Sequence, residues 1–222
     1  MVSDRGIIAP SAAGVKGGIR PTKGAFTMKQ RQSSTKSVQK LCVAALMAAL
    51  VFVSSQLQIQ IPSILGFSRF HLGNSMCALS GLLLGPWWGG LASGVGSALF
   101  DLFHPAYLSE APITLVTKGV YGLVSGFLCW RVFSGKPRYG VQALSTLCAA
   151  LCYTAIYLGK TFFYNGIWLG GLTPSAAWVA VLEKAPSSLF NGAVALICAP
   201  ILAVAVRRAM RTAQLEHLLP RQ

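Results

Sequence analysis

The chain has 222 residues, of which 54% are hydrophobic and 11% are charged, and its formal net charge is +14. The charged fraction is about half that of an ordinary soluble domain, which argues against a soluble enzyme. Twelve of the 19 Lys and Arg residues precede Leu41 or follow Val206, so the part between them is nearly neutral. This excludes a basic folded face for nucleic acid and indicates a membrane domain with basic tails.

The first 37 residues are rich in Gly, Ser, Thr, Lys and Arg and show no apolar period. Such a composition cannot bury enough surface to fold, so residues 1–37 are expected to be a disordered basic tail. Met28 is followed by KQRQSS and is a candidate for the true translation start. The first membrane helix is expected over residues 38–55, and residues 56–62 then alternate polar and apolar side chains, which indicates an extended segment.

The next 29 residues, 72–100, carry no charge and are too many for a single span. Gly85-Pro86 interrupts them, and proline cannot continue a helix. Two helices are therefore predicted, over residues 74–84 and 87–103, joined by a tight turn. Small residues repeat at four-residue spacing along both, which permits close approach of helix backbones.

Three further spans complete the predicted domain. They are expected over residues 112–133, over residues 141–164, and from a start between residues 175 and 185 to Val206. The uncharged residues 161–182 are expected to form a loop before the last span. The prediction is thus an all-α integral membrane protein with six transmembrane helices over residues 38–206 and a basic C-terminal tail over residues 207–222.

The distribution of basic residues predicts the orientation, because translocated loops contain few Lys and Arg. With both termini cytoplasmic, the two tails and the 131–138 loop hold 15 of the 19 basic residues. The remaining four, Arg69, Lys118, Lys160 and Lys184, then fall towards the outer half, where a solute from outside would arrive.

Ionisable groups inside a bilayer are costly, so each one suggests a functional site. Asp101 and Lys118 lie on consecutive predicted helices and could pair, either around a solute or as a purely structural ion pair. Lys160 lies near Tyr164 and offers a cation beside aromatic rings, or else a lysine that extends to the interface. Asn191 could bind a solute or a neighbouring helix.

The residues present do not form a recognisable catalytic or metal-binding motif. Gly159-Lys160-Thr161 lacks the first glycine of a phosphate loop, because Thr154 stands at that position. The six cysteines lie in apolar runs and show no metal-ligand spacing with the three histidines. We therefore expect neither an enzyme nor a bound metal or cofactor.

Four segments taken together resemble a known family: residues 70–74 (FHLGN), 82–90 (LLLGPWWGG), 94–101 (GVGSALFD) and 112–119 (PITLVTKG). The chain resembles the substrate-binding S component of energy-coupling factor (ECF) vitamin transporters over about residues 38–206. The resemblance implies a prokaryotic plasma-membrane protein that captures a vitamin or related micronutrient from outside. It also implies a membrane-embedded T component and two cytosolic ATPases as partners, which agrees with the absence of any ATP-binding motif here.

The resemblance also suggests surfaces and residues. In the family a small-residue face on the first helix meets the T component, and Ala44/Ala48 and Ala45/Ala49 match that spacing. The ligand lies near the outer face under the first loop, here residues 56–69. A carboxylate often follows the glycine that is Gly73 here, but position 74 is Asn, so flavin, pyrimidine, pyridoxine and queuosine-precursor ligands all stay open. The candidate substrate-binding residues are Arg69, Asn74, Asp101, Lys118, Lys160, Tyr164, Glu183 and Asn191.

Two other functions fit the residues. A self-sufficient secondary transporter could use Asp101 or Glu183 as a proton carrier, and it would transport its solute without partners. A structural assembly protein would bind no saturable ligand.

Overall fold

The computed structural model describes residues 23–63, 66–133 and 138–215. The chain divides into two compact units, Met1–Thr35 and Lys36–Gln222, and the described part of the first is the helical stretch 23–35. The elements in chain order are α1 (Lys23–Gln56), β1 (Gln58–Ser63), β2 (Gly66–His71), α2 (Gly73–Leu102), η1 (Pro105–Glu110), α3 (Ala111–Phe127), η2 (Leu128–Val132), α4 (Tyr139–Lys160), η3 (Thr161–Leu169) and α5 (Pro174–Thr212).

Helix α1 starts earlier than the sequence analysis expected. Residues 23–37 were expected to be disordered, and the structure has them as helix, while residues 1–22 of that tail lie outside the described residues. The apolar part of α1, Ser37–Gln56, agrees with the expected first span.

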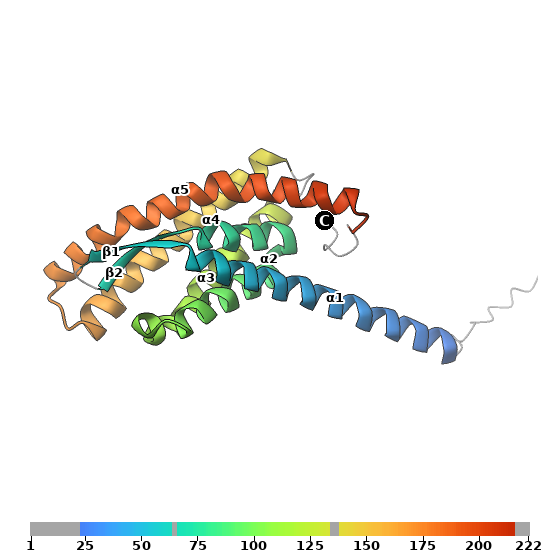
Figure 1. The fold of residues 1–222 in the computed structure, drawn as a ribbon, viewed down its shortest axis with the longest axis horizontal. Coiled ribbons are helices and arrows are strands. Elements are labelled where there is room, and N and C mark those ends of the chain that lie inside the picture. Colours follow the sequence, from blue (N-terminus) through green and yellow to red (C-terminus); the bar gives the residue numbers. More distant parts are fainter. Residues whose placement is uncertain (1–22, 64–65, 134–137, 216–222) are drawn as a thin grey trace, which may run out of the picture. The chain divides into compact units, whose positions relative to one another are not determined.

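The extended segment after α1 forms half of a β-hairpin. Strands β1 and β2 pair antiparallel, with Gln58 opposite His71 and Ile61 opposite Ser68. The alternation of residues 56–62 thus correctly predicted a strand, and β2 is an addition to a fold expected to be all-α. Figure 1 shows the hairpin beside α5, at the end of the helices where α4 leads into α5.

Helix α2 is two helical segments that fold back on each other. Gly85 between them has φ 79° and ψ −175°, a conformation that favours glycine, and Pro86 follows it. The Ser80 and Ser93 hydroxyl oxygens lie 2.6 Å apart, whereas residues 13 apart on a straight helix are separated by about 20 Å. The predicted break at Gly85-Pro86 is confirmed.

Small residues bring α2 and α3 into backbone contact. A Cβ atom added at Gly94 would lie 2.5 Å from the carbonyl oxygen of Leu115, and one at Gly122 would lie 2.7 Å from that of Gly89. Side chains larger than hydrogen do not fit there. The four-residue spacing of small residues therefore does mark a close helix interface.

The predicted loop over residues 161–182 is wrong except at residues 170–173, which separate two helical segments. Residues Thr161–Leu169 continue α4 as a π-helical segment, and α5 begins at Pro174, where Thr173 caps it by accepting a hydrogen bond from the Ala176 N–H. Asn165 and Gly166 suggested a turn, but tertiary contacts hold them in the helix. A Cβ at Gly166 would lie 2.9 Å from the Cβ of Ala177 on α5.

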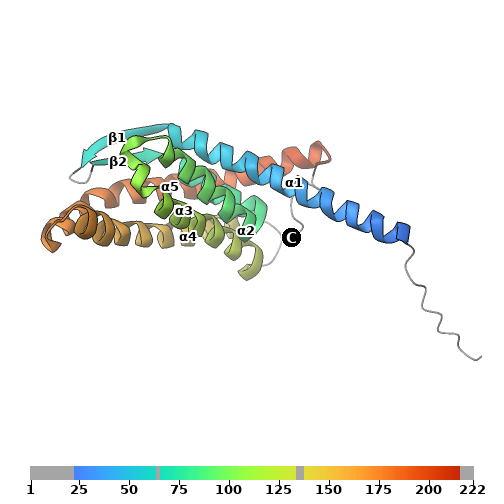
Figure 2. The ribbon, with the colours of Figure 1, turned by 90° about the horizontal axis from the view of Figure 1, so that it is seen from below.

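The helices have the character of a membrane protein. Within the described ranges, four segments are long and apolar enough to cross a bilayer: Ser37–Gln56, Pro105–Val132, Tyr139–Leu169 and Pro174–Thr212. Figure 2 shows α4 and α5 side by side, as their contacts require. The core draws on all five α-helices, and large apolar side chains such as Trp87, Trp168 and Ile197 are exposed on the outside. Exposed apolar surface of this kind suits lipid contact.

Candidate functional site

A polar pocket lies beneath the hairpin, between β2, α3, α4 and α5. It is rich in hydroxyl, aromatic and cationic side chains, although the helices around it are apolar. The pocket is lined by Arg69, His71, Thr114, Thr117, Lys118, Tyr153, Tyr157, Lys160, Ser187, Ser188 and Asn191. A second hollow beside it shares Arg69, His71, Thr114 and Lys118 and extends to Asp101 at the end of α2.

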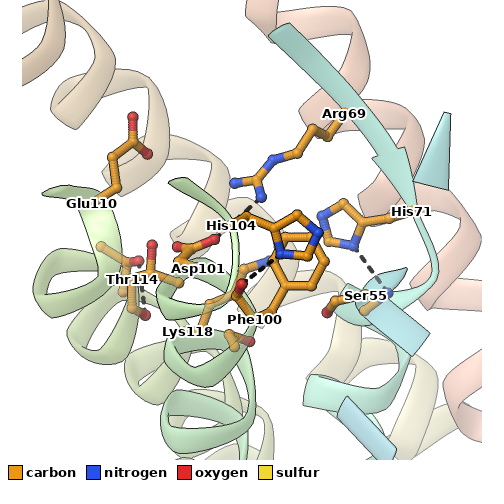
Figure 3. A network of polar contacts seen from close by, with 12 residues as sticks. Ser55, Arg69, His71, Phe100, Asp101, His104, Glu110, Thr114 and Lys118 are labelled. Atoms are coloured by element: carbon orange, nitrogen blue, oxygen red, sulfur yellow. Dashed lines mark hydrogen bonds and ion pairs between the residues drawn. The ribbon is translucent and has the colours of Figure 1, made fainter. Parts of the chain in front are cut away.

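Arg69 joins the hairpin to the end of α2. Its guanidinium lies 3.2 Å from the Asp101 carboxylate and stacks over the Tyr107 ring, 4.0 Å from the centroid. Figure 3 shows Arg69 reaching from β2 towards Asp101, with Lys118 approaching from α3. Asp101 is 1% exposed. A buried carboxylate of this kind needs such a charged partner.

The expected pair of Asp101 and Lys118 is therefore not the contact that forms. Lys118 donates instead to the side-chain oxygen of Asn74 on the first segment of α2, and its ammonium lies 4.3 Å from the ring centroid of Tyr153. The difference arises because β2 places Arg69 beside Asp101, and no local pattern in the sequence predicts the hairpin register that brings them together. Lys118 and Asn74 are both buried.

Lys160 has a carboxylate partner that the sequence analysis missed. Its ammonium lies 2.5 Å from Glu110 Oε2, and Asn165 Nδ2 donates to Glu110 Oε1 at 2.6 Å. These bonds tie the end of α4 to the turn before α3. Glu110 could have been recognised as a candidate partner, because it is one of only three acidic residues between Leu41 and Val206.

Asn191 on α5 binds the backbone of β2 in the way that a neighbouring strand would. Its Nδ2 donates to the Arg69 carbonyl oxygen at 2.8 Å, and its Oδ1 accepts from the His71 N–H at 3.0 Å. Phe70 and Phe190 pack edge to face beside these bonds. Asn191 thus fastens the hairpin over the pocket, and both polar groups of its amide are used in doing so.

His71 adds a second anchor at the end of β2. Its Nδ1 accepts a hydrogen bond from the Gly73 N–H at 3.0 Å. Burial, together with the nearby charges of Lys118 and Arg69, lowers the pKa of His71 well below its ordinary value. The imidazole is therefore neutral at physiological pH, as its acceptor role requires.

Three candidate residues line neither hollow, namely Asn74, Tyr164 and Glu183, and several lining residues were not predicted. Tyr164 packs against Trp168, with ring centroids 5.7 Å apart, and Glu183 is exposed. Of the residues missed, Tyr153 had a usable signal, because it precedes Tyr157 by one helical turn on the same face as Lys160. The other lining residues that were not among the candidates are His71, Thr114, Thr117, Tyr157, Ser187 and Ser188.

The four alanines expected to contact a partner divide into two pairs. Ala44 and Ala48 are buried in the core, whereas Ala45 and Ala49 are exposed. A Cβ added at Gly96 on α2 would lie 2.9 Å from Val51 Cβ and even closer to the Ala48 carbonyl oxygen. The inner pair therefore belongs to the close contact of α1 with α2, and only the outer pair is open to another protein.

Comparison with known proteins decides the family. The family model described as "ECF-type riboflavin transporter, S component" matches residues 35–208. The chain belongs to this family. The resemblance seen in the sequence is confirmed, and the chain is a membrane protein of vitamin uptake, from a family of transporter components and not of enzymes.

A curated relative matches part of the chain. An uncharacterized protein in the gap 3′ region of Pyrococcus woesei is 33% identical over 118 residues, which is 53% of this chain and 74% of that protein.

Proposed function

We propose that this S component is the membrane-embedded, high-affinity binding protein of an ECF-type importer for a vitamin or related micronutrient. The observation that carries the proposal is the polar, cationic pocket under a fastened hairpin, within a helical domain that is otherwise apolar. Polar groups buried in a membrane protein are costly to maintain, and their convergence on one pocket is typical of a solute site.

The lining supports a planar, heterocyclic ligand. Tyr153 and Tyr157 both line the pocket, and their rings stack with centroids 5.8 Å apart. Lysine, arginine and hydroxyl groups around them supply hydrogen-bond donors for ring nitrogens and carbonyl oxygens. Riboflavin is the first compound to test, because the matching family model carries its name.

The distribution of charge supports an outward-facing pocket. Trp130 Nε1 and the Arg207 guanidinium both donate to the Leu82 carbonyl oxygen, at 3.0 and 2.6 Å. That oxygen has no helical donor, because Pro86 lacks an N–H. The turn of α2, the segment around Arg131 and the basic end of α5 therefore lie together at one end of the domain. By the positive-inside rule this end is cytoplasmic.

We propose six membrane segments accordingly, with both termini in the cytoplasm. The four long apolar helices supply four of them. The two arms of α2 supply the others as a hairpin whose turn, at Gly85, faces the cytoplasm. The solute then enters from outside, beneath the β-hairpin.

Energy would come from partners. We propose that a T component docks on the exposed Ala45/Ala49 side of α1 and that two cytosolic ATPases drive release of the solute inward. Small exposed side chains at four-residue spacing support such a contact, because they let another helix approach closely.

Titration of the detergent-purified full chain with riboflavin tests the proposal, with tyrosine and tryptophan fluorescence as the readout. We expect saturable one-to-one binding without ATP, and no uptake by the chain alone in proteoliposomes. A stand-alone proton-coupled transporter would instead show uptake by this chain alone that disappears when the proton gradient is collapsed, and that result would contradict the proposal.

A further inference from the structure

The lining of the pocket contains three cationic side chains and no carboxylate. Arg69, Lys118 and Lys160 are its charged members among the described residues. Two of them have counterions close by: Arg69 has Asp101 at 3.2 Å and Lys160 has Glu110 at 2.5 Å. These two pairs contribute little net charge to the pocket.

Lys118 differs from the other two cations. Its ammonium donates to the Asn74 amide oxygen and lies over the Tyr153 ring, both of them neutral. Asp101 lines the second hollow together with Lys118, but the ion pair that Asp101 forms is with Arg69. Lys118 is only 6% exposed, and Asn74 only 1%. A buried ammonium that forms no ion pair is unfavourable, so an anionic group placed beside Lys118 would stabilise its positive charge.

Lys118 also lies where a ligand would reach it. It lines both hollows, and Tyr153, whose ring it contacts, stacks with Tyr121 at 5.3 Å and with Tyr157 at 5.8 Å. A cation and an aromatic ring are therefore adjacent in the lining of the pocket. This combination suits a flat ring that carries an acidic substituent.

We infer, building on the proposed function, that the ligand is an anionic heteroaromatic compound whose carboxylate or phosphate oxygens accept hydrogen bonds from the Lys118 ammonium. Asn74 sets this preference, because its neutral amide orients the Lys118 ammonium without neutralising it. The positive charge of Lys118 then stays available to the ligand. An aspartate at position 74 would have nearly the same shape and would neutralise Lys118 internally.

Matched pairs of ring compounds test the inference on the detergent-purified full chain. The pairs are nicotinamide and nicotinate, riboflavin and riboflavin 5′-phosphate, and pyridoxal and pyridoxal 5′-phosphate. Within each pair the ring is shared and only one member carries the added acidic group. We expect the anionic member of at least one pair to bind tenfold or more tightly than its neutral counterpart, as a charge-assisted hydrogen bond implies. The first pair reports on carboxylate and the other two on phosphate.

Two variants assign the preference to Lys118. Asn74→Asp should reduce the ratio of affinities within a pair towards one, because it places a carboxylate against the Lys118 ammonium and hardly alters the shape of the side chain. Lys118→Met should also reduce this ratio, because it removes the charge itself. Lys40→Met, which removes one positive charge from the exposed side of α1, should leave the ratio unchanged.

The outcomes separate this inference from the proposed function. Tight binding of riboflavin, with no gain in affinity for the anionic member of any of the three pairs, would support the proposed function and overturn the anionic ligand. An anion preference that survives both Asn74→Asp and Lys118→Met would overturn the role of Lys118. Binding of none of the six compounds would count against both.

Discussion

The α2–α3 interface and the cover of the pocket are held together by different means. Between α2 and α3, glycines such as Gly94 and Gly122 leave no room for side chains, so the backbones lie in direct contact. Over the pocket, the hairpin is held by individual polar bonds from Asn191, Asp101 and Gly73. Close packing has few alternative arrangements, whereas a small set of hydrogen bonds can open and reform. The comparison suggests a rigid base and a releasable cover.

The largest expected effect comes from filling the rigid interface. Gly122→Val would place a Cβ 2.7 Å from the Gly89 carbonyl oxygen and closer still to the Ser93 hydroxyl. Overpacking of this kind should lower the free energy of unfolding by about 3 kcal/mol, which thermal unfolding in detergent measures. Gly159→Val is the matched control, because a Cβ at Gly159 meets nothing within 4 Å. Equal stability of the two variants would show that the interface is not rigid.

The two faces of α1 should respond differently to the same enlargement. Ala48→Leu should lower the free energy of unfolding by about 1–3 kcal/mol, because Ala48 is buried against α2. Ala45→Leu should leave stability and ligand affinity unchanged but reduce recovery of the T component in co-purification. If Ala45→Leu has no effect on the complex, α1 does not dock the partner through that face.

Releasing the cover should change kinetics more than stability. Asn191→Leu removes both hydrogen bonds to β2 while nearly preserving side-chain volume, and each bond contributes about 1 kcal/mol. We expect the ligand to dissociate about tenfold faster in stopped-flow measurements. Asn191→Asp keeps the acceptor for the His71 N–H and should give a smaller increase. An unchanged dissociation rate in both variants would mean that the hairpin does not limit release.

The smallest effect is expected at the pair between Lys160 and Glu110. Lys160→Met should weaken binding about threefold to tenfold, because it removes a donor from the pocket and leaves the Glu110 carboxylate without its cation. Adding Glu110→Gln removes that stranded charge and should recover part of the affinity in the same titration. If Lys160→Met binds as the wild type does, the lysine serves only to position the end of α4.

Local signals predicted the helices of this fold better than they predicted its contacts. Gly85-Pro86 marked the turn of α2 because proline lacks a backbone donor, and the alternation of residues 56–62 marked β1. Asn165-Gly166 misled, because its turn propensity is overridden by contacts with Glu110 and with Ala177. Propensity acts locally, and only the assembled helices supply those partners.

The same limit applies to the site. Lys118, Lys160 and Asn191 could be selected from the sequence because polar residues are rare in apolar helices. Arg69 could be selected because it is one of the four basic residues outside the tails and the 131–138 loop. Their partners could not be selected, since pairing Arg69 with Asp101 depends on the register of β2 against β1. Ser187 and Ser188 gave no signal at all, because serines are common in membrane helices of every kind.

The central claim is that this chain alone holds a small heteroaromatic molecule in the pocket beneath the hairpin. Native mass spectrometry of freshly purified protein tests it most directly. We predict one bound small molecule per chain in the wild type and its loss in Lys118→Met, with Lys40→Met retaining it. A wild type that carries no such molecule even after incubation with riboflavin and the other test compounds, or a molecule equally retained by Lys118→Met, would contradict the account.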